Sequence, residues 1–209
     1  MIQKKGDLQI KHTSAAAIGS LEPARYSRVA ILLHWVIAAL ILVNLYLGLF
    51  HEDMAKPVRA TMMFYHKSIG LTVLALTVAR LAWRLGHRPP PYDAALKHWE
   101  VVLARATHWT FYILLLALPL SGWLLVSTGG RATSLFGLFD VPALPVSHAD
   151  GPHDLFESLH TLFGYAMLLL VVLHVAGALK HQFEGHRQVF GRIAPWAYRA
   201  GPKGSPSRT

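Results

Sequence analysis

The chain has 209 residues, of which 53% are hydrophobic, and it carries a net charge of +9 and no cysteine. This apolar content is higher than an ordinary soluble domain needs and indicates a membrane protein. The absence of cysteine excludes disulfide bonds, thiolate metal sites and the covalent attachment of c-type haem.

Four apolar segments predict four transmembrane helices. Residues 29–50, 106–130 and 158–179 contain no Asp, Glu, Lys or Arg, and each is long enough for the about 20 residues that a membrane span requires. The fourth segment, residues 68–79, extends past Lys67 and Arg80, whose long side chains can reach the membrane surface. The sequence therefore predicts an all-α integral membrane four-helix bundle with helices at 27–51, 59–85, 102–129 and 153–183. This bundle forms a domain over 25–195, between an N-terminal tail at 1–24 and a disordered C-terminal tail at 196–209.

The basic residues predict the orientation of this bundle. Sixteen of the 20 Lys and Arg residues fall on the side that holds both termini and the connection between the second and third helices. Because basic residues concentrate in cytoplasmic segments, both termini are predicted to be cytoplasmic. The charge is divided among three segments that flank the membrane, so the sequence does not indicate a nucleic-acid partner.

Four histidines lie within the predicted spans at matching depths. His160 and His174 are 14 positions apart in the last helix, which places them on one face and about 21 Å apart along the axis. His34 matches the depth of His174, and His66 matches that of His160. Ionisable side chains in hydrocarbon need partners, so the pairs His34/His174 and His66/His160 are predicted to be the axial iron ligands of two non-covalent b haems in the core.

Two imidazoles fill both axial positions of a haem iron, which suits electron transfer. Gly70, Gly164 and Gly177 lie close in sequence to these histidines and either admit a porphyrin or serve helix packing. His108 and Trp109 either bind a haem propionate or form an interfacial pair, the simpler interpretation. A metal-ion transporter is disfavoured because the spans contain no Asp or Glu, and a haem-free scaffold is a further alternative. No tandem repeat is evident.

Short motifs along most of the chain resemble those of the bacterial di-haem cytochrome b561 family. Their order and spacing, from about Tyr26 to Pro195, carry the resemblance more than any single motif. The motifs are Tyr26-Ser27-Arg28, Leu33-His34-Trp35, His66-Lys-Ser-Ile-Gly70, Ala117-Leu-Pro119-Leu-Ser-Gly122, Phe136-Gly-Leu-Phe139, Leu159-His160 with Gly164-Tyr165, Leu173-His174, Ala178-Leu179 and Lys180-His181.

The resemblance is greatest to the superoxide oxidase branch of this family. It implies an oxidoreductase of the bacterial inner membrane that passes electrons from superoxide outside, through two b haems, to ubiquinone. The ligand positions of the family fall on the same four histidines. His181 resembles a position proposed near the quinone, although a surface histidine in a basic stretch would look the same.

Lys67 and Arg131 are predicted to be catalytic in the sense that their charge would attract superoxide to the outer haem. Six acidic residues on the outer side outnumber the four basic ones, so this attraction depends on how the charges are arranged. The alternative function is a cytochrome b subunit that links the quinone pool to a partner dehydrogenase or hydrogenase. Both functions require membrane lipid as the surrounding solvent.

Overall fold

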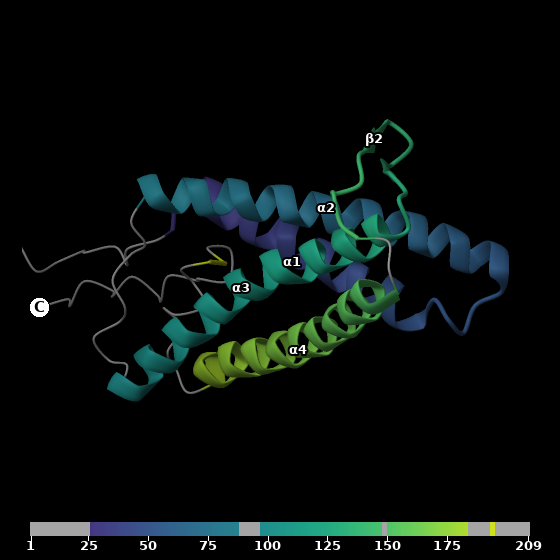
Figure 1. The fold of residues 1–209 in the computed structure, drawn as a ribbon. Coiled ribbons are helices and arrows are strands. Elements are labelled where there is room, and N and C mark those ends of the chain that lie inside the picture. Colours follow the sequence, from purple (N-terminus) through teal and green to yellow (C-terminus); the bar gives the residue numbers. More distant parts are fainter. Residues whose placement is uncertain (1–25, 88–96, 148–149, 184–192, 195–209) are drawn as a thin grey trace, which may run out of the picture.

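The structure is a computed structural model that describes residues 26–87, 97–147, 150–183 and 193–194 (Figure 1). The first and second of four long helices run along each other, as do the third and fourth, and the two pairs cross at an angle (Figure 1). A two-stranded hairpin lies between the third and fourth helices in the sequence. The elements are α1 (Arg28–Phe50), α2 (Lys56–Gly86), α3 (His98–Thr128), β1 (Thr133–Leu135), β2 (Phe139–Val141) and α4 (Asp150–Phe183). The two predicted terminal tails lie outside the described residues.

All four predicted helices are present, and α2, α3 and α4 each begin a few residues before their predicted starts. Helix α3 starts at His98, because the backbone N–H of Lys97 donates to the carboxylate of Glu100 at 2.9 Å and this capping contact stabilises an extra turn. Helix α2 starts at Lys56 and has Pro57 in its first turn, where the missing N–H of proline costs little.

Each helix is long and apolar enough to cross a membrane. Large apolar side chains such as Leu42, Ile113 and Leu169 are exposed along the outside of the bundle. Such a surface would associate in water, but it matches the hydrocarbon of a bilayer. The molecule is thus a membrane four-helix bundle, as the sequence predicts.

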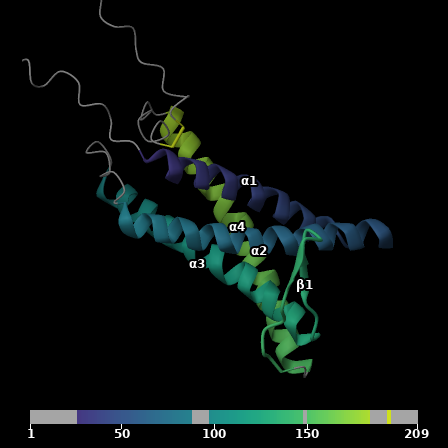
Figure 2. The same ribbon diagram turned by 90° about the horizontal axis from the view of Figure 1, so that it is seen from above.

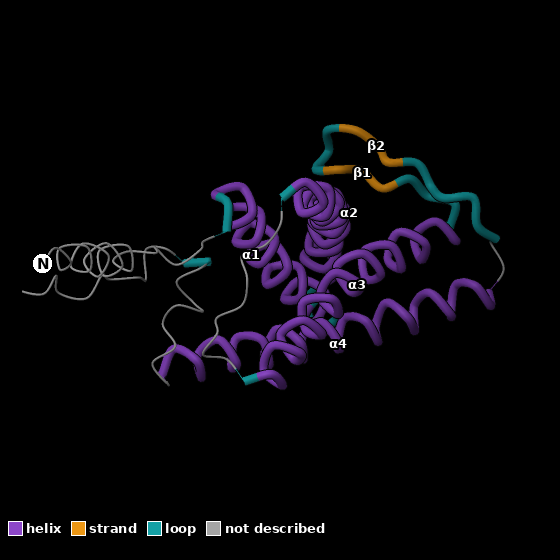
Figure 3. The backbone as a smooth tube through the Cα atoms, turned by 90° about the vertical axis from the view of Figure 1, so that its left-hand side faces the viewer, coloured by secondary structure: helices purple, strands orange, loops and turns teal. Residues whose placement is uncertain are grey.

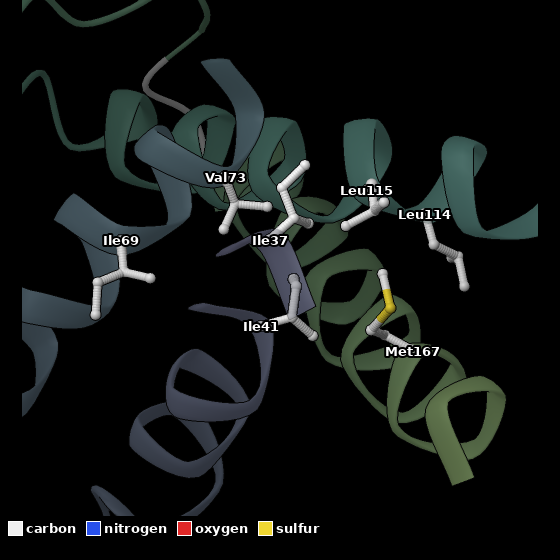
Figure 4. Close-up of a cluster of buried hydrophobic side chains, with 7 residues drawn as sticks. All are labelled: Ile37, Ile41, Ile69, Val73, Leu114, Leu115 and Met167. Atoms are coloured by element: carbon white, nitrogen blue, oxygen red, sulfur yellow. The ribbon is translucent and has the colours of Figure 1, made fainter. Parts of the chain in front are cut away.

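Helix α1 packs against α2, α2 against α3, and α3 against α4 (Figure 3). Helices α1 and α4 make at most sparse backbone contacts with each other. The centre is filled by seven buried apolar side chains contributed by all four helices (Figure 4). We call this group the central layer; it consists of Ile37, Ile41, Ile69, Val73, Leu114, Leu115 and Met167.

The β1–β2 hairpin lies beside α2 at one end of the bundle (Figure 2). Ser68 of α2 holds it there: the hydroxyl donates to the carbonyl of Ser134 at 3.1 Å and accepts from the N–H of Phe136 at 3.1 Å. Phe136 and Gly137 form the turn with positive φ angles of 53° and 76°, the pattern of a tight hairpin turn. The sequence alone predicts only a connection here. We call this the hairpin end, and the opposite end, where α1 and α3 begin, the terminal end.

Candidate haem-binding sites

Each of the four helices has two positions, 14 residues apart, that hold a histidine, a glycine or an arginine. These eight positions define two levels along the bundle, each with one position from every helix. This interval corresponds to about 21 Å along a helix. The hairpin level consists of Gly48, His66, Gly122 and His160. The terminal level consists of His34, Arg80, His108 and His174.

At the hairpin level, His66 of α2 and His160 of α4 face each other. Their ring centroids are 5.9 Å apart, and their planes are nearly perpendicular at 88°. Nδ1 of His66 lies 3.1 Å from the carbonyl oxygen of Asn44, and Nδ1 of His160 lies 3.0 Å from that of Leu118. Because a carbonyl only accepts, each Nδ1 carries the proton and each Nε2 keeps a lone pair. Metal-binding histidines are typically oriented by a second hydrogen bond of this kind.

Two glycines make room for these rings. A Cβ atom on Gly48 would lie 2.9 Å from Cε1 of His66, and a Cβ atom on Gly122 would lie 2.8 Å from Cε1 of His160. Each imidazole therefore rests directly on the backbone of the neighbouring helix. Gly48 was not among the predicted residues, and Gly122 was named only as the last residue of a family motif. Their interval of 14 residues from His34 and His108 was the available signal.

The glycines that the sequence analysis did select have other surroundings. A Cβ atom on Gly164 or Gly177 would meet no atom within 4 Å, and one on Gly70 would lie 3.6 Å from Nδ2 of Asn44. None of the three is in close contact with a histidine ring.

The helix pairs α1–α2 and α3–α4 repeat the same local arrangement. Leu118 and Gly122 lie 74 positions after Asn44 and Gly48, and they contact His160 as the earlier two contact His66. The correspondence lies in spacing rather than in residue identity, which explains why no tandem repeat is evident in the sequence. His108 is the counterpart of His34 by the same offset.

At the terminal level, His174 lies between two other histidines. Its ring centroid is 6.4 Å from that of His34 and 6.0 Å from that of His108. Phe111 packs edge-on against His174 at 5.1 Å. The structure thus brings the predicted partners His34 and His174 together and adds His108, for which the sequence left open a role in propionate binding or at the membrane interface, the latter being the simpler interpretation.

Both predicted pairs have the spacing that one shared metal ion requires. Two imidazole–metal bonds of about 2 Å each, plus the distance from each nitrogen to its ring centre, add up to about 6 Å. Among the described residues, no group of three or more His, Cys, Asp or Glu side chains forms a site for a bare metal ion. A pair of imidazoles does fit a haem, because the porphyrin supplies the other ligands.

The remaining predicted residues lie near these levels. Lys67 follows His66, is partly buried and exerts an electrostatic effect on its imidazole. Arg131 is exposed just beyond α3. His181 is partly buried near the end of α4 and interacts electrostatically with Glu100, whose carboxylate is 3.9 Å from Nζ of Lys180.

A family model described as prokaryotic cytochrome b561 matches residues 25–196. The chain belongs to the prokaryotic cytochrome b561 family. This membership confirms the resemblance noted in the sequence and establishes the protein as a multi-pass bacterial membrane protein. Members of the cytochrome b561 family bind b-type haem and carry electrons across membranes, so the histidine-rich levels lie in a protein that holds haem.

Named relatives agree with this membership. The chain is 32% identical to "Cytochrome b561 homolog 2" of Escherichia coli K12 over 171 residues, covering 77% of this chain and 86% of that protein. It is 26% identical to "Probable superoxide oxidase CybB" of Yersinia pestis, covering 82% of this chain and 96% of that protein. It is also 29% identical to "Cytochrome b562" of Cereibacter sphaeroides, covering 76% and 87% respectively.

Proposed function

We propose that this cytochrome b561 takes electrons from superoxide at its hairpin end and delivers them to ubiquinone at its terminal end. Two b haems carry the electrons, one held by His66 and His160 and the other by His34 and His174. The observation that carries the proposal is the pair of facing imidazoles at each level, with centroid distances of 5.9 and 6.4 Å. Each haem supplies a one-electron carrier whose two axial positions are closed to other ligands.

The distribution of charge supports this direction of transfer. By sequence, 16 of the 20 basic residues belong to the two terminal regions and to the region around the connection between α2 and α3, so we place the terminal end in the cytoplasm. The hairpin end then faces the periplasm of a bacterial inner membrane. Ubiquinone can reach the terminal end through the bilayer, and we assign His181, which resembles a family position near the quinone, to its binding.

Lys67 and Arg131 support superoxide as the donor. Both carry positive charge at the hairpin end, where a small anion would approach His66 and His160. Each superoxide that gives up one electron becomes dioxygen, and one ubiquinone accepts two electrons and two protons. The likeness to the Yersinia pestis protein named as a probable superoxide oxidase supports the same donor.

The test is a pulse of superoxide applied to the purified, haem-loaded protein in detergent, with haem absorbance followed over time. We expect rapid reduction of the haems and reoxidation when a soluble ubiquinone analogue is added. Superoxide dismutase added before the pulse should abolish the reduction.

The competing function is that of a cytochrome b subunit that serves a partner dehydrogenase or hydrogenase. In that case ubiquinol would reduce the haems readily and the superoxide pulse would not. That result would contradict the proposed function while leaving the haem ligands unaffected.

A further inference from the structure

One of the four positions that define the terminal level holds a fixed positive charge, whereas none of the four positions of the hairpin level does. Arg80 on α2 lies 14 positions after His66, as His174 on α4 lies 14 positions after His160. An arginine thus occupies the place that corresponds to a proposed haem ligand in the other helix pair.

Arg80 is partly buried, and its guanidinium lies over an aromatic ring. Its guanidinium carbon lies 6.0 Å from the ring centre of Tyr112, and that of Arg84 lies 5.5 Å from the same ring. Arg80 acts electrostatically on His34, His108 and His174, the three imidazoles of its level. Its charge is therefore directed at the terminal level.

No carboxylate within the described part of the chain forms an ion pair with Arg80. A guanidinium remains protonated under all physiological conditions. An arginine inside a membrane span without an acidic partner is unfavourable, and such residues usually have a functional role.

A fixed positive charge changes the redox balance of a nearby haem. Reduction adds one electron, so a neighbouring cation stabilises the reduced form relative to the oxidised form. The effect is larger in a membrane interior than in water, because the dielectric constant is lower. Charge and burial near the iron are among the factors that set haem potentials.

At the hairpin level, Lys67 also carries a positive charge beside His66, but the hydrogen bonds of the two histidines act in the opposite direction. The N–H groups of His66 and His160 donate to backbone carbonyls, and such bonds raise the basicity of a metal-binding imidazole. A more basic ligand favours the oxidised iron. The ring nitrogens of His34 and His174 have no such hydrogen bond among the described residues.

We propose that Arg80 sets the direction of electron transfer by giving the haem of the terminal level the higher midpoint potential. This inference rests on the haem pairs of the proposed function but not on superoxide or ubiquinone. Electrons that enter at the hairpin level would then move to the terminal level with a favourable free-energy change.

The experiment is an equilibrium redox titration of the haem-loaded protein followed by visible absorbance. We expect two separate midpoint potentials in the parent protein. His174→Ala should lose the higher-potential component, and His66→Ala should lose the lower one. Arg80→Gln should shift the higher potential downward and leave the lower one unchanged. In Arg80→Lys the higher midpoint potential should stay close to that of the parent protein, because lysine keeps the positive charge.

Lys56→Gln is the matched control, because it removes one positive charge from an exposed position at the far end of α2; it should change neither potential.

The inference is overturned if the higher-potential component survives in His174→Ala and is lost in His66→Ala, or if Arg80→Gln moves neither midpoint potential. It is also overturned if Arg80→Lys lowers the higher midpoint potential as much as Arg80→Gln does, because the loss of arginine packing and not of charge would then be the cause. If Arg80→Gln does not bind haem, the two histidine variants still decide which haem has the higher potential. Retention of both components in both histidine variants would instead contradict the haem pairing.

Discussion

The imidazole of His160 rests on the backbone of Gly122, at a point where a Cβ atom would lie 2.8 Å from Cε1 of the ring. Real Cβ atoms do not approach so closely, so any other residue at 122 must move the histidine or separate α3 from α4. The carbonyl of Leu118, one turn earlier on α3, also holds the ring through its hydrogen bond with Nδ1. Gly122 thus helps to fix the orientation of the His160 ring.

Gly122→Ala and Gly48→Ala should each disturb the haem of the hairpin level. The added methyl group meets the ring of His160 or His66, and overpacking of this kind typically costs about 1–3 kcal/mol. We expect loss of part of that haem or a change in its low-spin electron paramagnetic resonance signal. Gly86→Ala is the control, because a Cβ atom there meets nothing within 4 Å. A spectrum of Gly122→Ala identical to that of the control would show that the ring has room to move.

Replacement of the four histidines should separate the two haems. His66→Ala and His160→Ala should each remove the haem of the hairpin level, and His34→Ala and His174→Ala that of the terminal level. Each variant should retain about one haem per chain, measured by the pyridine haemochrome method against protein concentration. The physical reason is that iron with one remaining axial imidazole is bound more weakly.

His87→Ala provides the control for these variants, since His87 stacks on Trp83 at 3.8 Å, away from both levels; it should retain two haems. Depletion of the same spectral component by His34→Ala and His66→Ala would refute the pairing.

Superoxide should reduce the protein more slowly as the salt concentration rises. The Debye length falls from about 10 Å at 0.1 M to about 3 Å at 1 M, which screens the attraction of Lys67 and Arg131 for an anion. Lys67→Glu and Arg131→Glu should lower the bimolecular rate constant at low salt and weaken its dependence on salt. Arg59→Glu is the matched charge reversal on the same side, and it tests whether the effect is local. Rates that respond to neither salt nor charge would remove both residues from the catalytic role and leave the activity itself in place.

Loss of the Ser68 hydroxyl should detach the hairpin from α2. Ser68→Ala removes the acceptor for the N–H of Phe136 and the donor to the carbonyl of Ser134, a loss of about 1–3 kcal/mol for buried groups. We expect faster hydrogen exchange in peptides that cover β1 and β2. Thr61→Ala is the control, because its exposed hydroxyl bonds only to the carbonyl of Pro57 in its own helix. Unchanged exchange in Ser68→Ala would mean that other contacts hold the hairpin.

The sequence predicted the helices better than their ends. Apolar segments predict which residues lie in the membrane, but they do not predict where a helix begins or ends. Helix α3 begins at His98 because the carboxylate of Glu100 caps it through a polar contact. The hairpin was not predicted, because its strands have only three residues each and depend on Ser68 for anchoring.

The depths of the four histidines could be predicted because helical rise is regular, and the structure places the two rings of each predicted pair 5.9 and 6.4 Å apart. The roles of Gly48, Gly122 and Arg80 could not be read in this way. Each depends on a contact with a different helix, and helix periodicity says nothing about which neighbour lies opposite. That His108 belongs to the terminal level could not be predicted either, because it depends on the contact of His108 with His174 of α4.

The central layer also has a consequence for the energetics of the membrane. Met167 lies seven residues from both His160 and His174, and it is fully buried with six other apolar side chains between the two levels. None of these seven side chains can form a hydrogen bond that would pass a proton along. An electron can tunnel through such a layer, whereas an ion cannot cross it without a large solvation penalty. Each transfer from one level to the other would therefore move a net charge, so turnover itself contributes to the membrane voltage.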